Sequence, residues 1–415
     1  ALFENNIGWG NIAFGQQVLY KNTSGSYNIA LGDATLNQNT TGENNIANGH
    51  FALHRNTTAD NNIANGYQTL YFNTTGENNI ANGYQALYDN TTGENNIANG
   101  YRSLYNNTTA NNNIANGYEA LRTNTIGHDN IANGYFALYN NVDGNYNIAN
   151  GYQAMYANTS GEYNIASGWI ALTSNQTGNN NVALGRRALE VNVSGNNNIG
   201  IGARTLEAST TDNNTGIGAF ALQTPTTGAN NTGLGYGSDV SLVSATNATA
   251  LGYNSTATAS NYVRVGNTAV TSIFGAVAFN TSDGRFKTNI KNNVPGLDFI
   301  LKLRPVTYHF EKAKYSLHIG EKQDADYVKD LQAQDAENKT SSGFIAQEVE
   351  QVAKELNYDF DGLYKPQNDK DTYGISYQQF VVPLVKAVQE QQQMIQDLQL
   401  VVKQQQVLLE QLQKK

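Results

Sequence analysis

One seventeen-residue unit recurs along much of this chain, and it constrains the fold more than any other feature. A clear copy reads Asn-Ile-Ala-Asn-Gly-Tyr-Gln-Ala-Leu-Tyr-Asp-Asn-Thr-Thr-Gly-Glu-Asn at residues 79–95, and the next copy starts at Asn96. A branched apolar residue marks each unit, at Ile12, Ile29, Ile46, Ile63, Ile80, Ile97, Ile114, Ile131, Ile148, Ile165, Val182 and Ile199. A strict period of this length is typical of a solenoid, in which each repeat forms one coil and buries its core only against its neighbours.

The composition of the unit favours short strands over a helix. Asn-Asn pairs and glycines are too frequent for a helix, and no 3.6-residue apolar stripe is present. We expect an extended segment over residues 80–83, a second over 86–88, and a turn over 90–93, where Asn and Gly tolerate left-handed backbone. Parallel pairing of some sixteen coils at ~4.8 Å per coil predicts a rod roughly 75 Å long over residues 1–266.

Two ladders of identical side chains follow from the period. One is apolar and expected inside the coil: Leu19, Leu36, Leu53, Leu70, Leu87, Leu104, Leu121, Leu138, Met155, Leu172, Leu189 and Leu206. The other lies in the turn, where the amides can bond the coils above and below: Asn22, Asn39, Asn56, Asn73, Asn90, Asn107, Asn124, Asn141, Asn158, Asn175 and Asn192. We interpret the small Ala after each Ile as the close approach of a neighbouring chain, because one thin coil cannot bury its own core.

A third ladder occupies the position two residues after Ile, which we expect to face the axis of an assembly. This position is apolar near both ends of the shaft, as at Phe14 and Leu251. Between them it is polar, at Asn48, Asn65, Asn82, Asn99, Asn116, Asn133 and Asn150. Buried amides must be paired. Two interpretations stay open: an amide ladder that satisfies itself or is wetted and sets register, and an axial file filled by ions or water.

Two aromatic ladders run along the same coils. The first contains the candidate ligand contacts Tyr67, Tyr84, Tyr101, Tyr118, Tyr135 and Tyr152, and the second contains Tyr71, Tyr88, Tyr105, Tyr139 and Tyr156. Flat rings with a polar tip suit sugar stacking or protein contact. The alternative is structural: the rings pack on adjacent coils and cover loop backbone.

The repeats resemble the head of trimeric autotransporter adhesins of the YadA type. The residues that carry the resemblance are Asn181-Val182-Ala183-Leu184-Gly185 and the fourteen-residue step from Leu251-Gly252 to Val265-Gly266. The resemblance implies a left-handed parallel β-roll built by three chains. The seventeen-residue period departs from that family by three extra loop residues, and similar long repeats occur in tail-fibre proteins.

Composition excludes several classes of function. The 415 residues contain no Cys, so disulfides and thiolate metal sites are excluded. A net charge of −9 argues against a nucleic-acid partner, and no apolar run is long enough to span a membrane. We predict no metal site and no cofactor. The chain opens within a partial repeat, so we expect a fragment or processed form joined at its N-terminus to a larger fibre or baseplate.

A different kind of sequence begins after a junction at 267–281. The motifs Ser282-Asp283-Gly284-Arg285-Phe286-Lys287, Leu303-Arg304-Pro305, Gly343-Phe344-Ile345-Ala346-Gln347-Glu348 and Tyr373-Gly374-Ile375 occur in order. Their order closely resembles the intramolecular chaperone domain of phage endosialidases and tail spikes, classed as peptidase S74. The resemblance covers nearly the whole of 282–400, and we place the domain itself at 282–378. It implies that the domain drives trimerisation of the preceding fibre and often cuts itself off at the motif's Ser.

The residue types at this motif allow that chemistry. Ser282 is the candidate nucleophile, Lys287 the base if burial lowers its pKa, and Asp283 would orient the loop. Attack on the carbonyl of Thr281, followed by hydrolysis, would release the upstream chain. We therefore predict at most a single-turnover Ser/Lys autoprotease. The alternative is that the motif is kept for folding while cleavage is lost.

The rest of the second part reads mostly as helix. Residues 346–356 form an amphipathic pattern, and 322–339 are expected to be a polar surface excursion. His309 and His318 are expected to be ordinary polar residues. Residues 379–415 are predicted to form a coiled coil, with core positions Val388, Ile395, Val402 and Leu409 and, at the other site, Leu384, Gln391, Leu398, Gln405 and Leu412.

Together these features predict a mainly β, homotrimeric fibre: a solenoid shaft, a small α+β chaperone module and a trimeric coiled coil. The predicted function is structural or adhesive, as a phage-like tail fibre or a bacterial surface filament, located outside the cell or on a virion, with a glycan or protein receptor. Two alternatives stay open. One is a glycan-acting tail-spike hydrolase fragment, and the other is a filament with no ligand.

Overall fold

The computed structural model describes residues 1–224, 227–270, 285, 287–321, 325–337 and 339–413. The chain divides into two compact units, Ala1–Asn267 and Thr268–Lys415. Among the described residues, no helix is both long and apolar enough to cross a membrane.

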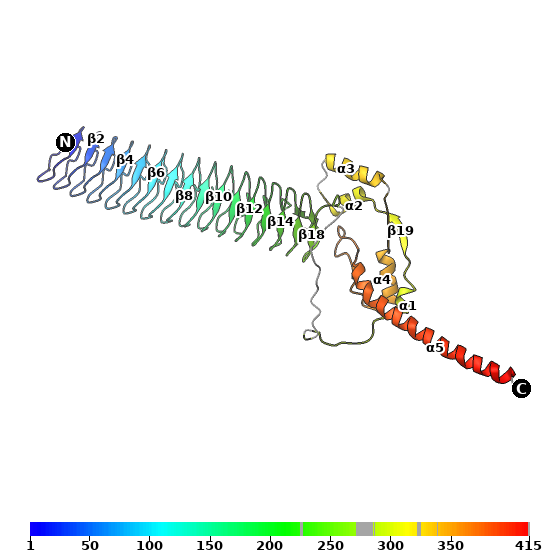
Figure 1. The fold of residues 1–415 in the computed structure, drawn as a ribbon. Coiled ribbons are helices and arrows are strands. Elements are labelled where there is room, and N and C mark those ends of the chain that lie inside the picture. The colour runs from blue at the N-terminus through cyan, green and yellow to red at the C-terminus, as the bar shows by residue number, and fades with distance from the viewer. Residues whose placement is uncertain (225–226, 271–284, 286, 322–324, 338, 414–415) are drawn as a thin grey trace. The chain divides into compact units, whose positions relative to one another are not determined.

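The first unit is a parallel β-solenoid with one three-residue strand per coil (Figure 1). Sixteen strands pair in one sheet: β1 (Ile12–Phe14), β2 (Ile29–Leu31), β3 (Ile46–Asn48), β4 (Ile63–Asn65), β5 (Ile80–Asn82), β6 (Ile97–Asn99), β7 (Ile114–Asn116), β8 (Ile131–Asn133), β9 (Ile148–Asn150), β10 (Ile165–Ser167), β11 (Val182–Leu184), β12 (Ile199–Ile201), β13 (Thr215–Ile217), β14 (Thr232–Leu234), β16 (Thr249–Leu251) and β18 (Val263–Val265). Each residue pairs with its counterpart one repeat on, as Ile80 does with Ile97. The predicted solenoid and its seventeen-residue coils are confirmed.

The predicted second strand of each coil is wrong for the seventeen-residue repeats. Residues 84–89 form turns, and Leu87 has a left-handed backbone with φ of 51°. A left-handed Leu costs roughly 1–2 kcal/mol, and full burial of its side chain offsets that cost. Within the described part of the shaft, a second short sheet forms near its end, between β15 (Asp239–Val240) and β17 (Thr256–Ala257).

The interior of the coil is made by the Ala and Leu ladders together. Ala81 and Leu87 are both fully buried within the single chain. At Gly200, which takes the Ala position in its coil, an added Cβ would lie 3.3 Å from the Cγ of Leu189. Ala is therefore small because it packs against its own chain's Leu ladder. The interpretation that a neighbouring chain approaches there is wrong.

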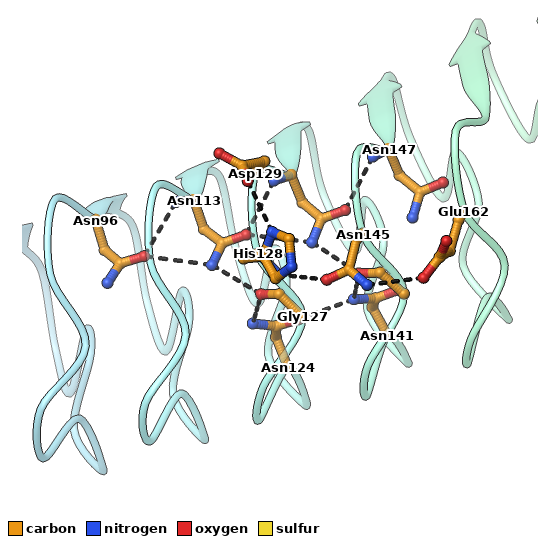
Figure 2. A network of polar contacts seen from close by, with 12 residues as sticks. Asn96, Asn113, Asn124, Gly127, His128, Asp129, Asn141, Asn145, Asn147 and Glu162 are labelled. Carbon is orange, nitrogen blue, oxygen red and sulfur yellow. Dashed lines mark hydrogen bonds and ion pairs between the residues drawn. The ribbon is translucent and has the colours of Figure 1, made fainter.

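Two fully buried asparagine ladders line the rest of the interior (Figure 2). In the predicted turn ladder, Asn90 Nδ2 donates to Asn73 Oδ1 at 2.8 Å and to the carbonyl of Gly93 at 2.9 Å. That ladder is confirmed. The other buried ladder consists of the Asn that precedes the first residue of each strand from β2 to β14. It was not predicted from the sequence. Asn79 donates from its backbone nitrogen to Asn62 Oδ1 at 3.0 Å and from Nδ2 to Gly93 O at 2.8 Å.

The second unit combines small sheets with helices (Figure 1). Its elements are α1 (Leu297–Ile300), β19 (Val306–His309), α2 (Lys312–Ile319), α3 (Ala325–Ala336), β20 (Thr340–Gly343), α4 (Ala346–Glu355), β21 (Leu363–Tyr364), β22 (Gly374–Ile375), the 3-10 helix η2 (Tyr377–Phe380) and α5 (Val381–Gln413). Strands β19 and β20 pair antiparallel, as do β21 and β22. Phe299, Val349, Ala353, Phe360 and Phe380 form the core.

The helix predictions are partly confirmed. Helix α4 covers the predicted amphipathic segment and buries Val349 and Ala353, and α5 covers most of the predicted coiled-coil segment. The polar surface excursion at 322–339 is wrong for its described residues, because α3 forms there and buries Tyr327 and Leu331. Its two apolar contacts were too few to give a visible stripe in the sequence.

Candidate functional site

The asparagines two positions after each Ile, from Asn48 to Asn150, form the outer asparagine ladder. From Asn65 onward their side chains are joined by amide hydrogen bonds. Asn65 Nδ2 donates to Asn82 Oδ1 at 2.8 Å, and Asn82 Nδ2 donates to Asn99 Oδ1 at 2.7 Å. The same bond continues through Asn116 and Asn133 to Asn150 at 2.7–2.9 Å. These side chains are half-buried on the outer face of the sheet.

The ladder therefore satisfies its own amides along the shaft, as one of the two sequence interpretations requires. It does not face the coil interior, because the residue between Ile and Asn in each strand points inward instead. Occupancy of this face by ions or water stays a prediction. Asn48 lies at the N-terminal end of the ladder and is exposed.

The first tyrosine ladder stacks ring on ring. Successive centroids from Tyr67 to Tyr152 lie 4.9–5.5 Å apart, with planes 6–14° from parallel. Tyr84 and Tyr118 are about 40% exposed. Both faces of each inner ring are covered by its two neighbours, so the ladder presents ring edges and hydroxyls to solvent rather than faces. This packing is the structural alternative stated above, and contact with a ligand stays a prediction.

The second tyrosine ladder is interrupted by an arginine. Tyr71, Tyr88 and Tyr105 stack with centroids 5.0–5.3 Å apart, and burial raises the pKa of the Tyr88 hydroxyl. Arg122 then takes the tyrosine position, with its guanidinium 6.0 Å from the Tyr105 ring and 5.5 Å from the Tyr139 ring. Such cation–π contacts substitute for ring stacking within the ladder.

A third polar row lies on the outer rim of the coils beside the buried ladders (Figure 2). The backbone nitrogen of His128 donates to Asn145 Oδ1 at 2.9 Å, and Asn145 Nδ2 donates to Glu162 Oε1 at 2.8 Å. His128 Nδ1 lies 2.7 Å from Asp129 Oδ2. Asn145 and Glu162 differ in type, but each supplies a side-chain oxygen that accepts the bond from the preceding coil.

The predicted cleavage site lies mostly outside the described residues. Thr281, Ser282 and Asp283 are among those not described, so the structure does not test their arrangement. Lys287 is described and is exposed in this single chain. The burial that a catalytic lysine requires is therefore not found in the isolated subunit.

A buried carboxylate in the second unit was not predicted. Glu321 follows α2 and is only 3% exposed. Its Oε2 accepts hydrogen bonds from Ser316 Oγ at 2.8 Å, from Thr268 Oγ1 at 3.1 Å and from the hydroxyl of Tyr327. Burial, with the bond to Glu321, raises the pKa of Tyr327 to about 12. The cluster fixes α2 and α3 to the start of the unit, and no sequence spacing signals it.

The second unit also carries an aromatic groove of about 490 Å³. Its lining includes Tyr308, Phe310, Tyr315, Phe344, Tyr373 and Tyr377. His309 and His318 line a neighbouring depression that also includes Glu311 and Lys314. Among the described residues, no group of His, Asp and Glu side chains could hold a metal ion.

Helix α5 exposes a long apolar stripe beyond its first turns. The predicted core positions are 43–70% exposed in the single chain: Leu384, Val388, Ile395, Leu398, Val402, Leu409 and Leu412. Pro383 and Ala387, near the start of the helix, are its buried residues. A stripe of this length is typical of a helix that pairs with other helices.

Comparison with known families assigns one segment of the chain. Residues 282–358 match the family model described as chaperone of endosialidase, peptidase S74. The resemblance expected for the C-terminal part is thereby confirmed over this span. No curated protein matches the chain. A β-solenoid followed by such a domain fits a structural protein of the tail-fibre or tail-spike type.

Proposed function

We propose that this chain is the subunit of a homotrimeric, extracellular or virion-borne fibre, and that its C-terminal part assembles the three copies. The observation that carries the proposal is the exposed apolar stripe of α5, which continues from a chaperone-type domain. Burial of one such Leu or Ile contributes on the order of 1–2 kcal/mol. The stripe therefore supplies a large driving force for association.

Two polar residues within the stripe support a specific arrangement. Gln391 and Gln405 occupy core heptad positions between Leu384, Leu398 and Leu412. Polar core residues lower the stability of a coiled coil but specify its register and number of helices. Register matters here because a shaft of near-identical coils pairs almost equally well one coil out of step.

The outer face of the shaft supports the same assembly. Ile12 and Phe14 are exposed at one end of the sheet, and Val263 and Val265 at the other. Copies of the chain placed side by side would cover these residues. Parallel pairing of distant coils is slow, so a helical bundle that first collects three chains would speed shaft formation.

Substitution within the stripe tests assembly. We expect Ile395→Asp to convert the trimer to monomer and to lower the yield of refolded shaft at least about tenfold, because a charge would be buried in the bundle. Gln396→Asp, on the polar side of the same helix, is the matched control and should leave both unchanged. A trimer that survives Ile395→Asp would contradict this role of α5.

We also propose self-cleavage between Thr281 and Ser282. The hydroxyl of Ser282 would attack the Thr281 carbonyl carbon, and the peptide C–N bond would break to leave an ester and a free amine. Water would then hydrolyse the ester. The family match, which begins at Ser282, supports this step, and Lys287 would need burial by another copy to act as base. Denaturing mass spectrometry of wild type and Ser282→Ala tests it: an uncut wild-type chain would refute cleavage.

Attachment to a cell surface is proposed for the shaft. The exposed edges and hydroxyls of the first tyrosine ladder offer repeated contacts to a glycan or protein receptor. Binding of the shaft to a glycan array should fall when Tyr84, Tyr101 and Tyr118 are replaced by Leu, which keeps the apolar packing. Unchanged binding would show that the first tyrosine ladder does not contact the glycan.

A further inference from the structure

The outer asparagine ladder has a chemical property that its hydrogen bonds do not reveal. Every one of its members is followed by glycine, in the pairs Asn48–Gly49, Asn65–Gly66, Asn82–Gly83, Asn99–Gly100, Asn116–Gly117, Asn133–Gly134 and Asn150–Gly151. A glycine offers no side chain to hinder attack of its backbone nitrogen on the preceding Asn side chain. We propose that these seven pairs are latent sites of spontaneous deamidation, which the folded coil holds unreactive.

The reaction needs water as its only co-reactant. The backbone nitrogen of Gly83 loses its proton and attacks Cγ of Asn82, a C–N bond forms, and the side-chain amide leaves as ammonia. The product is a five-membered succinimide. Water then opens either of its two carbonyls, which gives aspartate or isoaspartate in place of Asn82.

The strand geometry blocks the first step. The nitrogen of Gly83 donates its hydrogen to the carbonyl of Asn65 at 2.9 Å, and Gly100 donates in the same way to Asn82 at 2.8 Å. Asn82 is the last residue of β5, so its backbone is extended, and a parallel strand has ψ of about +115°. Ring closure requires rotation away from that value, which breaks the ladder bond.

Side-chain bonding adds a second restraint, and it is uneven along the ladder. Asn82 is held between Asn65 and Asn99 by bonds of 2.8 and 2.7 Å. Asn48 is exposed and lies beside Leu31, which offers its amide no partner. Within the folded shaft, Asn48 is therefore expected to react before the six other members.

Deamidation would prevent a chain from rebuilding its shaft. Isoaspartate adds a methylene to the main chain, which displaces every later residue of the strand from its parallel partner. Aspartate places carboxylates about 4.8 Å apart along the ladder, and these repel each other. A chain that stays unfolded would lose its ability to form coils 3 to 9, whereas a folded shaft would keep it.

The full-length protein tests this directly. Folded protein and protein unfolded in guanidinium are incubated at pH 8, and deamidation at each Asn is measured by peptide mass spectrometry. We expect loss at the seven Asn–Gly pairs of the unfolded chain, and a rate roughly a hundredfold lower at Asn82 in the folded chain, because reaction there requires local opening. Asn90–Thr91 of the buried ladder is the internal control and should stay intact in both.

Two results would overturn the proposal. One is equal deamidation at Asn82 in folded and unfolded protein, which would show that the ladder gives no protection. The other is a refolding yield that falls equally, after incubation of the unfolded chain, in wild type and in a variant with Ser at all seven Asn positions. Ser is the residue that the shaft itself uses at this position in Ser167, so the variant should refold fully after the same incubation.

Discussion

The two units of this chain solve the problem of burial in opposite ways. The shaft buries small and polar groups in repeated rows, such as Ala81 and Asn79, and each row is satisfied by its own copies one coil away. The C-terminal unit buries Phe299, Phe360 and Phe380 in one irregular cluster. In the shaft a residue is constrained by the same residue in the next coil, whereas in the second unit each core residue has unique neighbours.

These two modes of burial determine where each unit tolerates substitution. A substitution in one coil of the shaft disturbs both adjacent coils, because backbone and side-chain hydrogen bonds join each coil to the next. The aromatic core can repack around a change in volume. Backbone crowding should therefore harm the shaft most.

The largest effect is expected at a shaft glycine. An added Cβ at Gly83 would lie 2.4 Å from the carbonyl oxygen of Gly100, and the residue has φ of 131°. Gly83→Ala should lower the free energy of shaft unfolding by at least ~3 kcal/mol, measured by guanidinium denaturation. At Gly374 of the second unit the nearest atom would be the Tyr364 Cβ at 3.4 Å. Gly374→Ala is the control. An equal loss of stability there would contradict the predicted difference between the shaft and the second unit.

The next effect separates the buried ladder from the outer one. Asn79→Ala removes the acceptor of the Asn96 backbone nitrogen and the side-chain donor to Asn62 and Gly93. The buried Asn96 nitrogen is left unpaired, at ~1–3 kcal/mol, and the lost side-chain hydrogen bonds add to this cost. We expect a total loss near ~3–5 kcal/mol in the free energy of unfolding. Asn82→Ala, on the half-exposed outer face, should cost about 1 kcal/mol or less. Similar losses at both sites would contradict the assignment of interior and exterior.

Tyrosine stacking should contribute less than the buried amides. Tyr101 stacks on Tyr84 at 5.2 Å and on Tyr118 at 4.9 Å. Tyr101→Leu keeps apolar contact and should cost ~1–2 kcal/mol, since each ring pair contributes about 0.5–1.5 kcal/mol. Tyr163 stacks on Tyr146 alone, so Tyr163→Leu should cost about half as much in the same denaturation measurement.

The smallest effect is a pH dependence confined to the second unit. Hydrogen bonds from Lys354, Lys365 and Tyr373 lower the pKa of the Glu350 carboxyl from 4.5 to about 2. Because its folded pKa is lowered, Glu350 stabilises the unit above pH 4.5, and this stabilisation is lost as the pH falls from 4.5 towards 2. Glu350→Gln should flatten that part of the stability–pH curve. The same curve for the shaft should be unaffected by the substitution.

The sequence predicted the structure best in the shaft, where the repeat period determines which residues lie next to one another. Ile80 and its copies place the strands, Leu87 and Asn90 their ladders, and the predictions for these residues are confirmed in position. The conformation at Leu87 was not predictable, because a buried Leu in left-handed backbone is held by tertiary packing against its own propensity. The ladder at Asn79 was missed, although an Asn before every Ile was a visible signal.

The second unit was predictable only in its long periodic segments. Helices α4 and α5 follow from apolar spacing in their own sequence. Helix α3 and the Glu321 cluster depend on single contacts between residues far apart, such as Thr268 with Tyr327 at 2.9 Å. No local pattern encodes such contacts. The catalytic prediction at Ser282 lies outside the described residues and stays a prediction.

The mass of the native protein tests whether three identical chains build one fibre. Multi-angle light scattering of the purified full chain, with denaturing mass spectrometry to detect cleavage, gives the number of chains. We predict a particle of three times the 45.0 kDa chain mass, or three times the mass of the cleaved shaft together with its retained fragment. A folded particle with the mass of a single chain would contradict the trimeric fibre.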